Sequence, residues 1–312
     1  MDLEGESVFN YARYLASKEP VDERSLNRNV WDAFAKALSA YEPQSDDSPV
    51  KILEVGAGIG ATFRRIANLP AKQHLTYTLL DLEAVNLDYF KGHANSWMRM
   101  IGYVRLSEER LVWKNEAGRV IEVELVLADI HDYLSESNAS LWDIVVGQAF
   151  LDLFDLETFL PALFRLIAPG GLFYFPINFD GITSFLPSLE PSLDDRVEDV
   201  YHSSMDARAL KPGVRGRSQS GRHLLSELMK LELHTLEVGS SDWIVYPRQG
   251  EYAGDEAYFL QQILQFVKNE LSKSNEVSPE EAKYWVRTRL NQLQKRKLIY
   301  LAHQIDVFGK LP

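Results

Sequence analysis

The strongest constraint on this chain is a glycine-rich turn that joins a predicted strand to a predicted helix. Residues 50–55 form a short, mostly apolar run typical of a buried strand, and Gly56-Ala57-Gly58-Ile59-Gly60 follows it directly. Residues 61–69 have the pattern of a helix that ends before Pro70. Glycines let a backbone turn sharply and approach a ligand closely, and the helix behind such a turn offers free N–H groups. The sequence therefore predicts a strand, a ligand-binding turn and a helix in succession.

Short β-branched runs alternate with longer amphipathic stretches over residues 50–180. This alternation indicates a parallel sheet covered by helices. The fold class that we expect is α/β, doubly wound and mostly parallel, with helices on both faces of the sheet. After the first strand and helix we expect strands at 75–80, 120–128, 142–146 and 172–177, a hairpin partner at 110–114, and helices at 82–101 and 156–167.

The flanks of this core have a different pattern. Residues 1–49 are predicted to form a helical extension or lid, with two helices separated at Glu19-Pro20-Val21-Asp22 and Asp22 as the cap of the second. Residues 181–220 are rich in Gly, Pro and Ser and are expected to be a variable loop or lid. Residues 221–312 are expected to complete the core and to carry a helical insertion. Their elements are predicted as a helix at 222–231, a strand at 234–238, helices at 255–273 and 279–295, and a strand at 298–307.

Composition and charge exclude several classes of site and partner. The chain has 312 residues and no cysteine, which excludes disulfides, thiolate metal sites and a cysteine nucleophile. Its 45 acidic residues against 33 Lys and Arg give a net charge of −12, which disfavours nucleic acid as a partner. No apolar run is long enough to span a membrane and residues 1–4 lack the start of a signal peptide, so we expect a cytoplasmic protein with no membrane partner. A small molecule is the expected partner, no metal is expected, and a homodimer is left open.

An acidic residue at the end of the second predicted strand adds a group that can bind ribose. Asp81 lies 25 residues beyond Gly56, where its carboxylate can accept hydrogen bonds from ribose hydroxyls. The glycine turn and Asp81 together predict a pocket for an adenosine-type cofactor. Residues 56–61 also satisfy the pattern G-x-G-x-x-[GA], so the glycine spacing leaves a nicotinamide or flavin dinucleotide open.

At this point the sequence resembles the class I S-adenosylmethionine-dependent methyltransferases, whose first motif is E/D-x-G-x-G-x-G at the end of strand one. The match is Glu54, Gly56, Gly58 and Gly60, and the resemblance covers residues 50–180. It implies S-adenosyl-L-methionine as the cofactor and a seven-stranded sheet whose last two strands form an antiparallel edge. The cofactor-binding residues that it implies are Glu54, Gly56, Ala57, Gly58, Gly60, Asp81, Leu82, Asp129, Ile130 and Gln148.

The resemblance also implies a role for several of these side chains. Asp81 corresponds to the acid that binds ribose, and Asp129 to the acid that reaches the adenine amino group. Gln148 is expected beside the methionine moiety and the substrate. The activity implied is in-line transfer of a methyl group to an oxygen or nitrogen of a small molecule.

Three other functions stay open. An NAD(P)-dependent oxidoreductase fits the glycine spacing, and a nucleoside-binding module without activity fits the fold. The intact Gly56, Gly58 and Gly60 disfavour the inactive module. Methylation of RNA or protein is a third alternative. The net negative charge of the chain disfavours RNA as the substrate.

Candidate bases for removing a proton from the acceptor come from the ends of the strands and from the predicted lid. Asp152, His202 and His223 are the catalytic candidates, and Asp180 and Tyr201 lie in the same segments. His303 and Asp306 are three residues apart on a predicted strand, which sends their side chains to opposite faces. We therefore expect no His-Asp dyad there.

Overall fold

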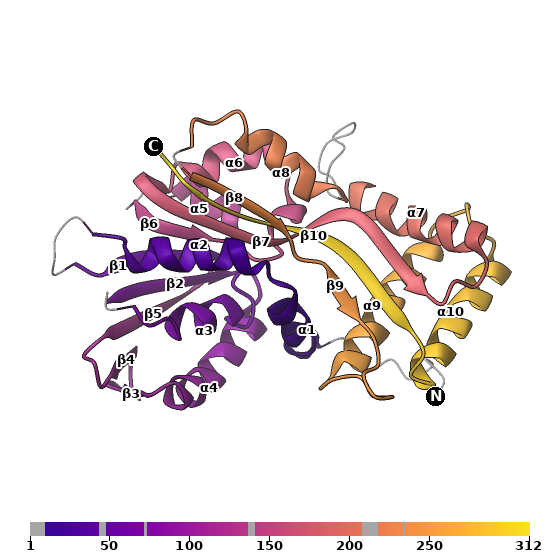
Figure 1. The fold of residues 1–312 in the computed structure, drawn as a ribbon, viewed down its shortest axis with the longest axis horizontal. Helices are drawn as coiled ribbons and strands as arrows, with labels where there is room; N and C mark the ends of the chain where they lie inside the picture. Colours follow the sequence, from indigo (N-terminus) through magenta and orange to yellow (C-terminus); the bar gives the residue numbers. More distant parts are fainter. Residues whose placement is uncertain (1–9, 44–47, 72–73, 137–140, 208–217, 234) are drawn as a thin grey trace.

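The computed structural model of the chain describes residues 10–43, 48–71, 74–136, 141–207, 218–233 and 235–312. Its strands form a ten-stranded mixed sheet in the order β3-β4-β5-β2-β1-β6-β7-β10-β8, and β9 pairs with β10 off this path (Figure 1). The strands are β1 (Val50–Val55), β2 (Leu75–Asp81), β3 (Tyr103–Arg105), β4 (Leu111–Asn115), β5 (Val120–Leu127), β6 (Trp142–Val146), β7 (Ile167–Leu186), β8 (Thr235–Ser240), β9 (Trp243–Val245) and β10 (Ile299–Lys310). The helices are α1 (Tyr11–Ser25), α2 (Arg28–Ser39), α3 (Ala61–Ala67), α4 (Ala84–Met100), α5 (Ile130–Glu136), η1 (Leu151–Leu153), α6 (Leu156–Phe164), α7 (Pro191–Ala207), α8 (Ser220–Leu228), α9 (Glu256–Leu271) and α10 (Pro279–Gln294).

The parallel part of the sheet has β1 at its centre. Strand β1 pairs with β2 on one side and with β6 on the other, and the pairs β2–β5 and β6–β7 are also parallel. Residues on both faces of this sheet form the parallel core: Ile52 packs with α2, α3 and α4 on one face, whereas its neighbour Leu53 packs with α5, α6 and α8 on the other. Strands that are buried on both faces carry continuous apolar runs, which explains why the sequence predicts this part of the fold. The doubly wound arrangement with helices on both faces is confirmed.

A second core lies beyond the parallel sheet. Strands β7 and β10 pair antiparallel along most of their length and continue past the parallel strands as a two-stranded ribbon (Figure 1). Helices α7, α9 and α10 and strand β9 pack on this ribbon around buried aromatic side chains. The Phe185 ring of β7, for example, lies 5.1 Å between centroids from both the Trp285 ring of α10 and the Tyr300 ring of β10.

The sheet and the segment after it differ from the sequence-based expectation. In the described part of the chain the sheet has ten strands rather than seven, because β3 and β4 extend one edge and β9 pairs with β10. It is mixed rather than mostly parallel, because β3, β4, β8, β9 and β10 all pair antiparallel. Strand β7, expected to end at Ile177, continues to Leu186 because β10 pairs with it over that whole range. The loop expected at 181–220 contains the end of β7 and helix α7, whose Val197 is buried in the second core; residues 208–217 lie outside the described residues.

The N-terminal helices also differ in where they divide. Helix α1 runs through Pro20, and the break falls at Leu26 and Asn27. Asn27, not Asp22, caps α2, with its side-chain oxygen accepting the backbone N–H groups of Asn29 and Val30. Pro20 disfavours a continuous helix, and burial of the residue after it, Val21, in the second core opposes that effect.

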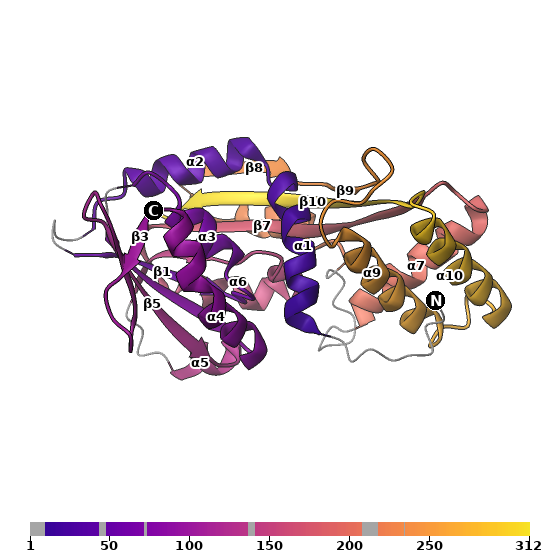
Figure 2. The same cartoon turned by 90° about the horizontal axis from the view of Figure 1, so that it is seen from below.

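Helix α1 occupies a position between the two cores. Figure 2 shows it passing between the helices that cover the parallel sheet and the lobe that contains α9 and α10. It contacts α4 on one side and α9 and β9 on the other. Among the described residues, no helix has the length and apolarity needed to cross a membrane.

Candidate functional site

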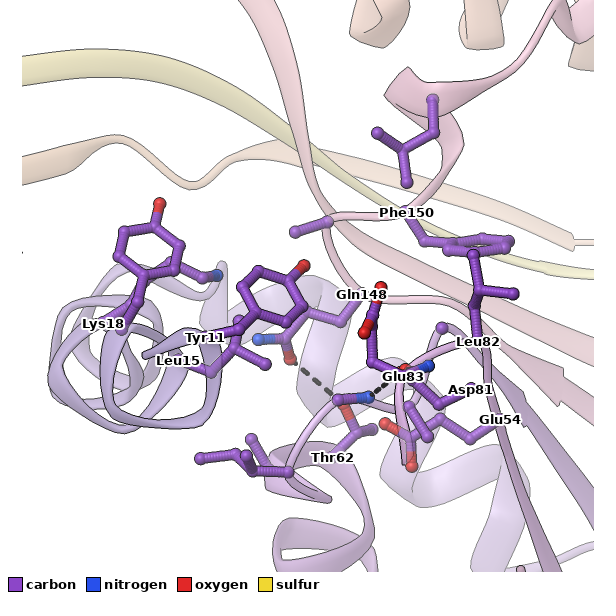
Figure 3. A pocket seen from close by; sticks show the side chains of 18 of the residues that line it. Tyr11, Leu15, Lys18, Glu54, Thr62, Asp81, Leu82, Glu83, Gln148 and Phe150 are labelled. Atoms are coloured by element: carbon purple, nitrogen blue, oxygen red, sulfur yellow. Dashed lines mark hydrogen bonds between the residues drawn. The ribbon is translucent and has the colours of Figure 1, made fainter. Parts of the chain in front are cut away.

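A cavity of about 1070 Å³ opens at the carboxyl ends of β1, β2, β5 and β6, beneath helix α1 (Figure 3). The chain reverses its direction of winding at β1, since β2 and β6 lie on its two sides. Ligands of open α/β sheets bind in the crevice that this reversal leaves at the carboxyl ends of the strands. The volume is that of a site for a cofactor with a second small molecule.

The glycine turn after β1 forms one wall of this cavity. Gly56, Gly58 and Gly60 have φ angles of 60°, 53° and 81°, in the left-handed region that favours glycine. A Cβ atom at Gly56 would overlap the ring of Phe150, and one at Gly60 would overlap the ring of Phe90. The glycines are therefore needed both for the backbone path and for the close packing of two aromatic rings.

Asp81 lies at the end of β2, against the glycine turn. Its carboxylate accepts the backbone N–H of Gly58 at 2.7 Å, the backbone N–H of Glu83 at 2.8 Å and the side-chain amide of Asn86 at 3.1 Å. A carboxylate has about four acceptor positions, so one remains for a ligand hydroxyl. Asp81 lines the cavity as the sequence predicts, and it also holds the turn in place.

Glu54 lines the cavity but is bonded to protein groups. The Tyr77 hydroxyl donates to its carboxylate at 2.7 Å. Burial raises the pKa of Glu54 to about 7, although the Tyr77 hydroxyl, the charge of Arg65 and the backbone N–H of Phe63 favour its charged form. Glu54 therefore joins β1 to its neighbour β2 and to the start of α3.

The remaining cofactor residues predicted at the strand ends also line the cavity. Leu82, directly after β2, is 61% exposed, while Ile130, after β5, is buried. Asp129 accepts the backbone N–H of His131 at 2.7 Å and so begins helix α5. Ala57 lies within the glycine turn, where its N–H donates to the Leu80 carbonyl.

Gln148 connects the parallel core to helix α1. Its side-chain oxygen accepts the Thr62 hydroxyl at 3.0 Å, and its side-chain N–H donates to Asp22 at 2.8 Å. Asp22 in turn forms a buried ion pair with Lys18, one helical turn earlier. Figure 3 shows Gln148 between the side chains of α1 and the glycine turn.

Helix α1 contributes side chains that the sequence analysis did not identify as site residues. These are Tyr11, Tyr14, Leu15 and Lys18, and Asp22, which the sequence predicts as a helix cap, lines the cavity with them. Tyr11, Leu15, Lys18 and Asp22 are spaced by three or four residues, so they share one helical face, and Tyr14 lies beside Leu15. That spacing is the signal that could have found them, and it was obscured by the predicted break at Pro20.

Ion pairs fix α1 on both of its sides. Arg64 and Arg65 of α3 pair with Glu19 and Glu23 of α1. Toward α9, Arg24 pairs with the buried Glu256. Pairs with an exposed member contribute under about 1 kcal/mol each, so α1 is attached to α3 more weakly than a packed core helix would be.

The catalytic candidates divide between the cavity and the surrounding structure. Asp152 of η1 and Tyr201 of α7 line the cavity. Burial, and to a smaller extent the charges of Asp81, Glu83 and Asp152, raise the pKa of Tyr11 to about 12.

The two predicted histidines lie outside the cavity lining. His202 points its ring toward Phe179, 5.6 Å between centroids, and burial lowers its pKa. His223 lies on α8, which packs on the far face of the parallel sheet. Asp180 pairs with Arg222 at 2.9 Å. His202 and His223 lie away from the cavity because α7 and α8, which carry them, are helices packed on the cores and do not form the expected lid.

His303 and Asp306 point to different partners, as their spacing on a strand predicts. Asp306 accepts the backbone N–H groups of Asn27 and Ile177 at 2.8 and 2.7 Å. His303 bonds to Asp242 at 2.7 Å. The two residues do not form a dyad.

The cavity lining is strongly acidic. Among the described residues, Lys18 is the one cation that lines it, and its ammonium is paired with Asp22. No described group of three or more His, Asp or Glu side chains is arranged to hold a metal ion. The carboxylates of the lining are those of Glu19, Asp22, Glu54, Asp81, Glu83, Asp129 and Asp152.

Comparison with known proteins gives structural matches only. No protein-family profile matches the chain, and no curated protein matches its sequence. Haemonchus contortus phosphoethanolamine N-methyltransferase 2, solved with phosphomonomethylethanolamine and S-adenosylhomocysteine, matches with 13% identity and a TM-score of 0.37 over 97% of this chain and 61% of that one. The CurJ carbon methyltransferase matches with 13% identity and a TM-score of 0.47 over 96% of this chain and 58% of that one.

A third match has a length closer to that of this chain. The plantazolicin methyltransferase BpumL, solved with S-adenosylhomocysteine, matches with 13% identity and a TM-score of 0.39 over 96% of this chain and 86% of that one. The chain thus spans about three fifths of the first two structures and most of the third. These low values leave the chemistry of the cavity as the ground for a functional proposal.

Proposed function

We propose that the chain is an S-adenosylmethionine-dependent methyltransferase that acts on a small molecule. The observation that carries this proposal is the acidic lining of a nucleoside-sized crevice at the carboxyl edge of the sheet. S-adenosylmethionine carries a positive sulfonium and a positive amino group, both of which a carboxylate-lined cavity attracts. A dinucleotide carries a pyrophosphate, which the same lining repels.

The glycine turn itself also favours a nucleoside without phosphates. In dinucleotide sites the backbone N–H groups of such a turn bind the pyrophosphate. Here the N–H of Gly58 donates to Asp81, and the N–H of Gly60 donates to the carbonyl of Ala57. These donors are engaged within the protein, so the oxidoreductase alternative is disfavoured.

The residues that would hold the cofactor are those already at the cavity wall. Asp81 would accept a ribose hydroxyl at its remaining acceptor position, and Asp129 would accept a hydrogen bond from the adenine amino group. Leu82 and Ile130, apolar residues of the lining, would contact the adenine ring. Gln148 would lie beside the methionine moiety.

Bound S-adenosylmethionine would supply an electrophilic methyl group to a nucleophile that approaches in line with the sulfur. The chain's own part is to position both molecules and to keep water out. Helix α1 covers the cavity for this purpose, and the Gln148–Asp22 hydrogen bond joins the cofactor wall to that cover. Asp152 is the lining carboxylate nearest in sequence to Gln148 and stays a candidate for accepting the proton of an oxygen or nitrogen acceptor.

Titration calorimetry with S-adenosylmethionine, S-adenosylhomocysteine and NADH tests this proposal. We expect both sulfur nucleosides to bind and NADH to bind at least a hundredfold more weakly. Asp81→Asn should weaken binding of S-adenosylhomocysteine by about ten- to a hundredfold, because hydrogen bonds to a charged acceptor contribute about 1.5–3 kcal/mol.

Asp88→Asn is the matched control, because Asp88 is an exposed acid on α4. It should leave binding unchanged. Tight binding of NADH with no binding of either sulfur nucleoside would transfer the assignment to an oxidoreductase. Binding of S-adenosylmethionine with no product formed from any acceptor would favour the inactive module.

A further inference from the structure

The cavity has two ends with different chemistry. One end is formed by the glycine turn and the ends of β2 and β5, and it holds most of the carboxylates. The other end, which we call the aromatic end, is formed by α1, α7, β9 and α9, outside the parallel core. Its lining residues are Tyr14, Lys18, Asp22, Ala149, Tyr201, Trp243 and Phe266.

Aromatic rings form the walls of the aromatic end. The Tyr14 ring of α1 lies edge-on to the Phe266 ring of α9, 5.5 Å between centroids. Trp243 of β9 lies edge-on to the Phe259 ring beneath, also at 5.5 Å. Such walls bind flat apolar groups, which offer large contact area with little loss of conformational entropy.

Two buried polar atoms at this end have no hydrogen-bond partner among the described residues. The Oδ2 atom of Asp22 accepts both Lys18 and Gln148, while its Oδ1 atom accepts nothing. The indole N–H of Trp243 donates to nothing. Buried polar groups are nearly always satisfied, and leaving one unpaired costs stability. These two atoms belong to residues that line the same cavity, so they are the groups that a ligand reaching into this end would satisfy.

The charges at this end favour an uncharged ligand. The Lys18 ammonium pairs with Asp22 and lies 5.1 Å from the centroid of the Trp243 ring. The Trp243 ring could otherwise attract a cationic ligand, but the Lys18 ammonium already lies over that ring and would repel it. An anionic ligand would be repelled by the carboxylates in the rest of the cavity. The described lining offers it no cation that is not already paired.

We infer that the aromatic end binds the methyl acceptor, and that the acceptor is an uncharged, flat molecule with an O–H or N–H group that donates to Asp22. The substrate class rests on the proposed methyltransferase function, whereas the binding preference of the aromatic end does not. Trp243 contributes a second hydrogen bond, to an oxygen or nitrogen of the ligand. Asp22 and Trp243 are thus specificity residues contributed by α1 and β9.

Binding of 2-naphthol to the full chain tests this inference, with 2-naphthyl phosphate and 2-naphthylmethylamine as its charged counterparts. Calorimetry is run with and without saturating S-adenosylhomocysteine. We expect 2-naphthol to bind at least tenfold more tightly than either charged probe. Asp22→Asn and Trp243→Phe should each weaken its binding about tenfold. Trp243→Phe should also leave the affinity for S-adenosylhomocysteine within twofold, because Trp243 makes no hydrogen bond to the wall proposed for the cofactor.

Asp32→Asn on the exposed face of α2 is the matched control, and thermal melts check that each variant is folded. If Asp22→Asn does not fold, Trp243→Phe still tests the site, because it removes only the N–H group and keeps an aromatic ring. Equal binding of all three probes, or 2-naphthol binding that neither variant weakens, would overturn the inference. Failure of S-adenosylhomocysteine to bind would overturn the proposed function, while 2-naphthol measured without it still decides the preference of the aromatic end.

Discussion

At the scale of single residues, the site depends on groups that serve the fold and the ligand together. Asp81 holds the glycine turn through Gly58 and keeps one acceptor position, which we propose for a ribose hydroxyl. Glu54 is bonded to Tyr77 at the start of the same turn. The sequence predicts these residues because their spacing around a strand end is local. It does not predict Asp22 or Trp243, which meet in the cavity from opposite ends of the chain.

Gly60→Ala should destabilise the protein by about 1–3 kcal/mol, because Gly60 has a φ angle of 81° and its Cβ atom would overlap Phe90. Gly92→Ala is the matched control, since Gly92 lies within α4 with nothing within 4 Å of an added Cβ. It should stabilise the helix by about 0.5–1 kcal/mol. Urea unfolding of both variants measures the difference. Equal stability of the two would show that the turn tolerates a side chain.

At the scale of elements, a helix or strand is predicted well when its position depends on its own sequence, and poorly when it depends on residues far away in the chain. Strands β1, β2 and β6 are predicted well, because burial on both faces leaves a continuous apolar run. Strand β7 is predicted too short, because its second half is fixed by pairing with β10, more than a hundred residues later. Helix α1 is predicted to break at Pro20, because the packing that holds it together comes from α9 and β9.

Helix α1 should become more protected when the cofactor binds. Its residues Tyr11, Leu15 and Lys18 line the cavity, and its ion pairs to α3 are partly exposed and weak. Hydrogen exchange measured with and without S-adenosylhomocysteine should show slower exchange for amides of α1. Helix α10, which lies outside the cavity lining in the second core, should be unchanged. Unchanged exchange in α1 would contradict its role as the cover of the site.

At the scale of the whole molecule, two cores share the long β7–β10 ribbon, and helix α1 lies between them (Figure 2). The cavity is lined by residues of both cores and of α1. The parallel core supplies the wall proposed for the cofactor, and the second core supplies the wall proposed for the acceptor. This division explains why the sequence predicts the first wall and not the second. The second wall is assembled from α1, α7, β9 and α9, which no local pattern connects.

A crystal structure of the chain with S-adenosylhomocysteine tests the central claim most directly. We expect the ligand in the cavity, with its ribose hydroxyls within hydrogen-bond distance of the Asp81 carboxylate and its sulfur directed toward Gln148 and the aromatic end. A ligand bound elsewhere on the molecule, or a ribose that makes no contact with Asp81, would contradict the account.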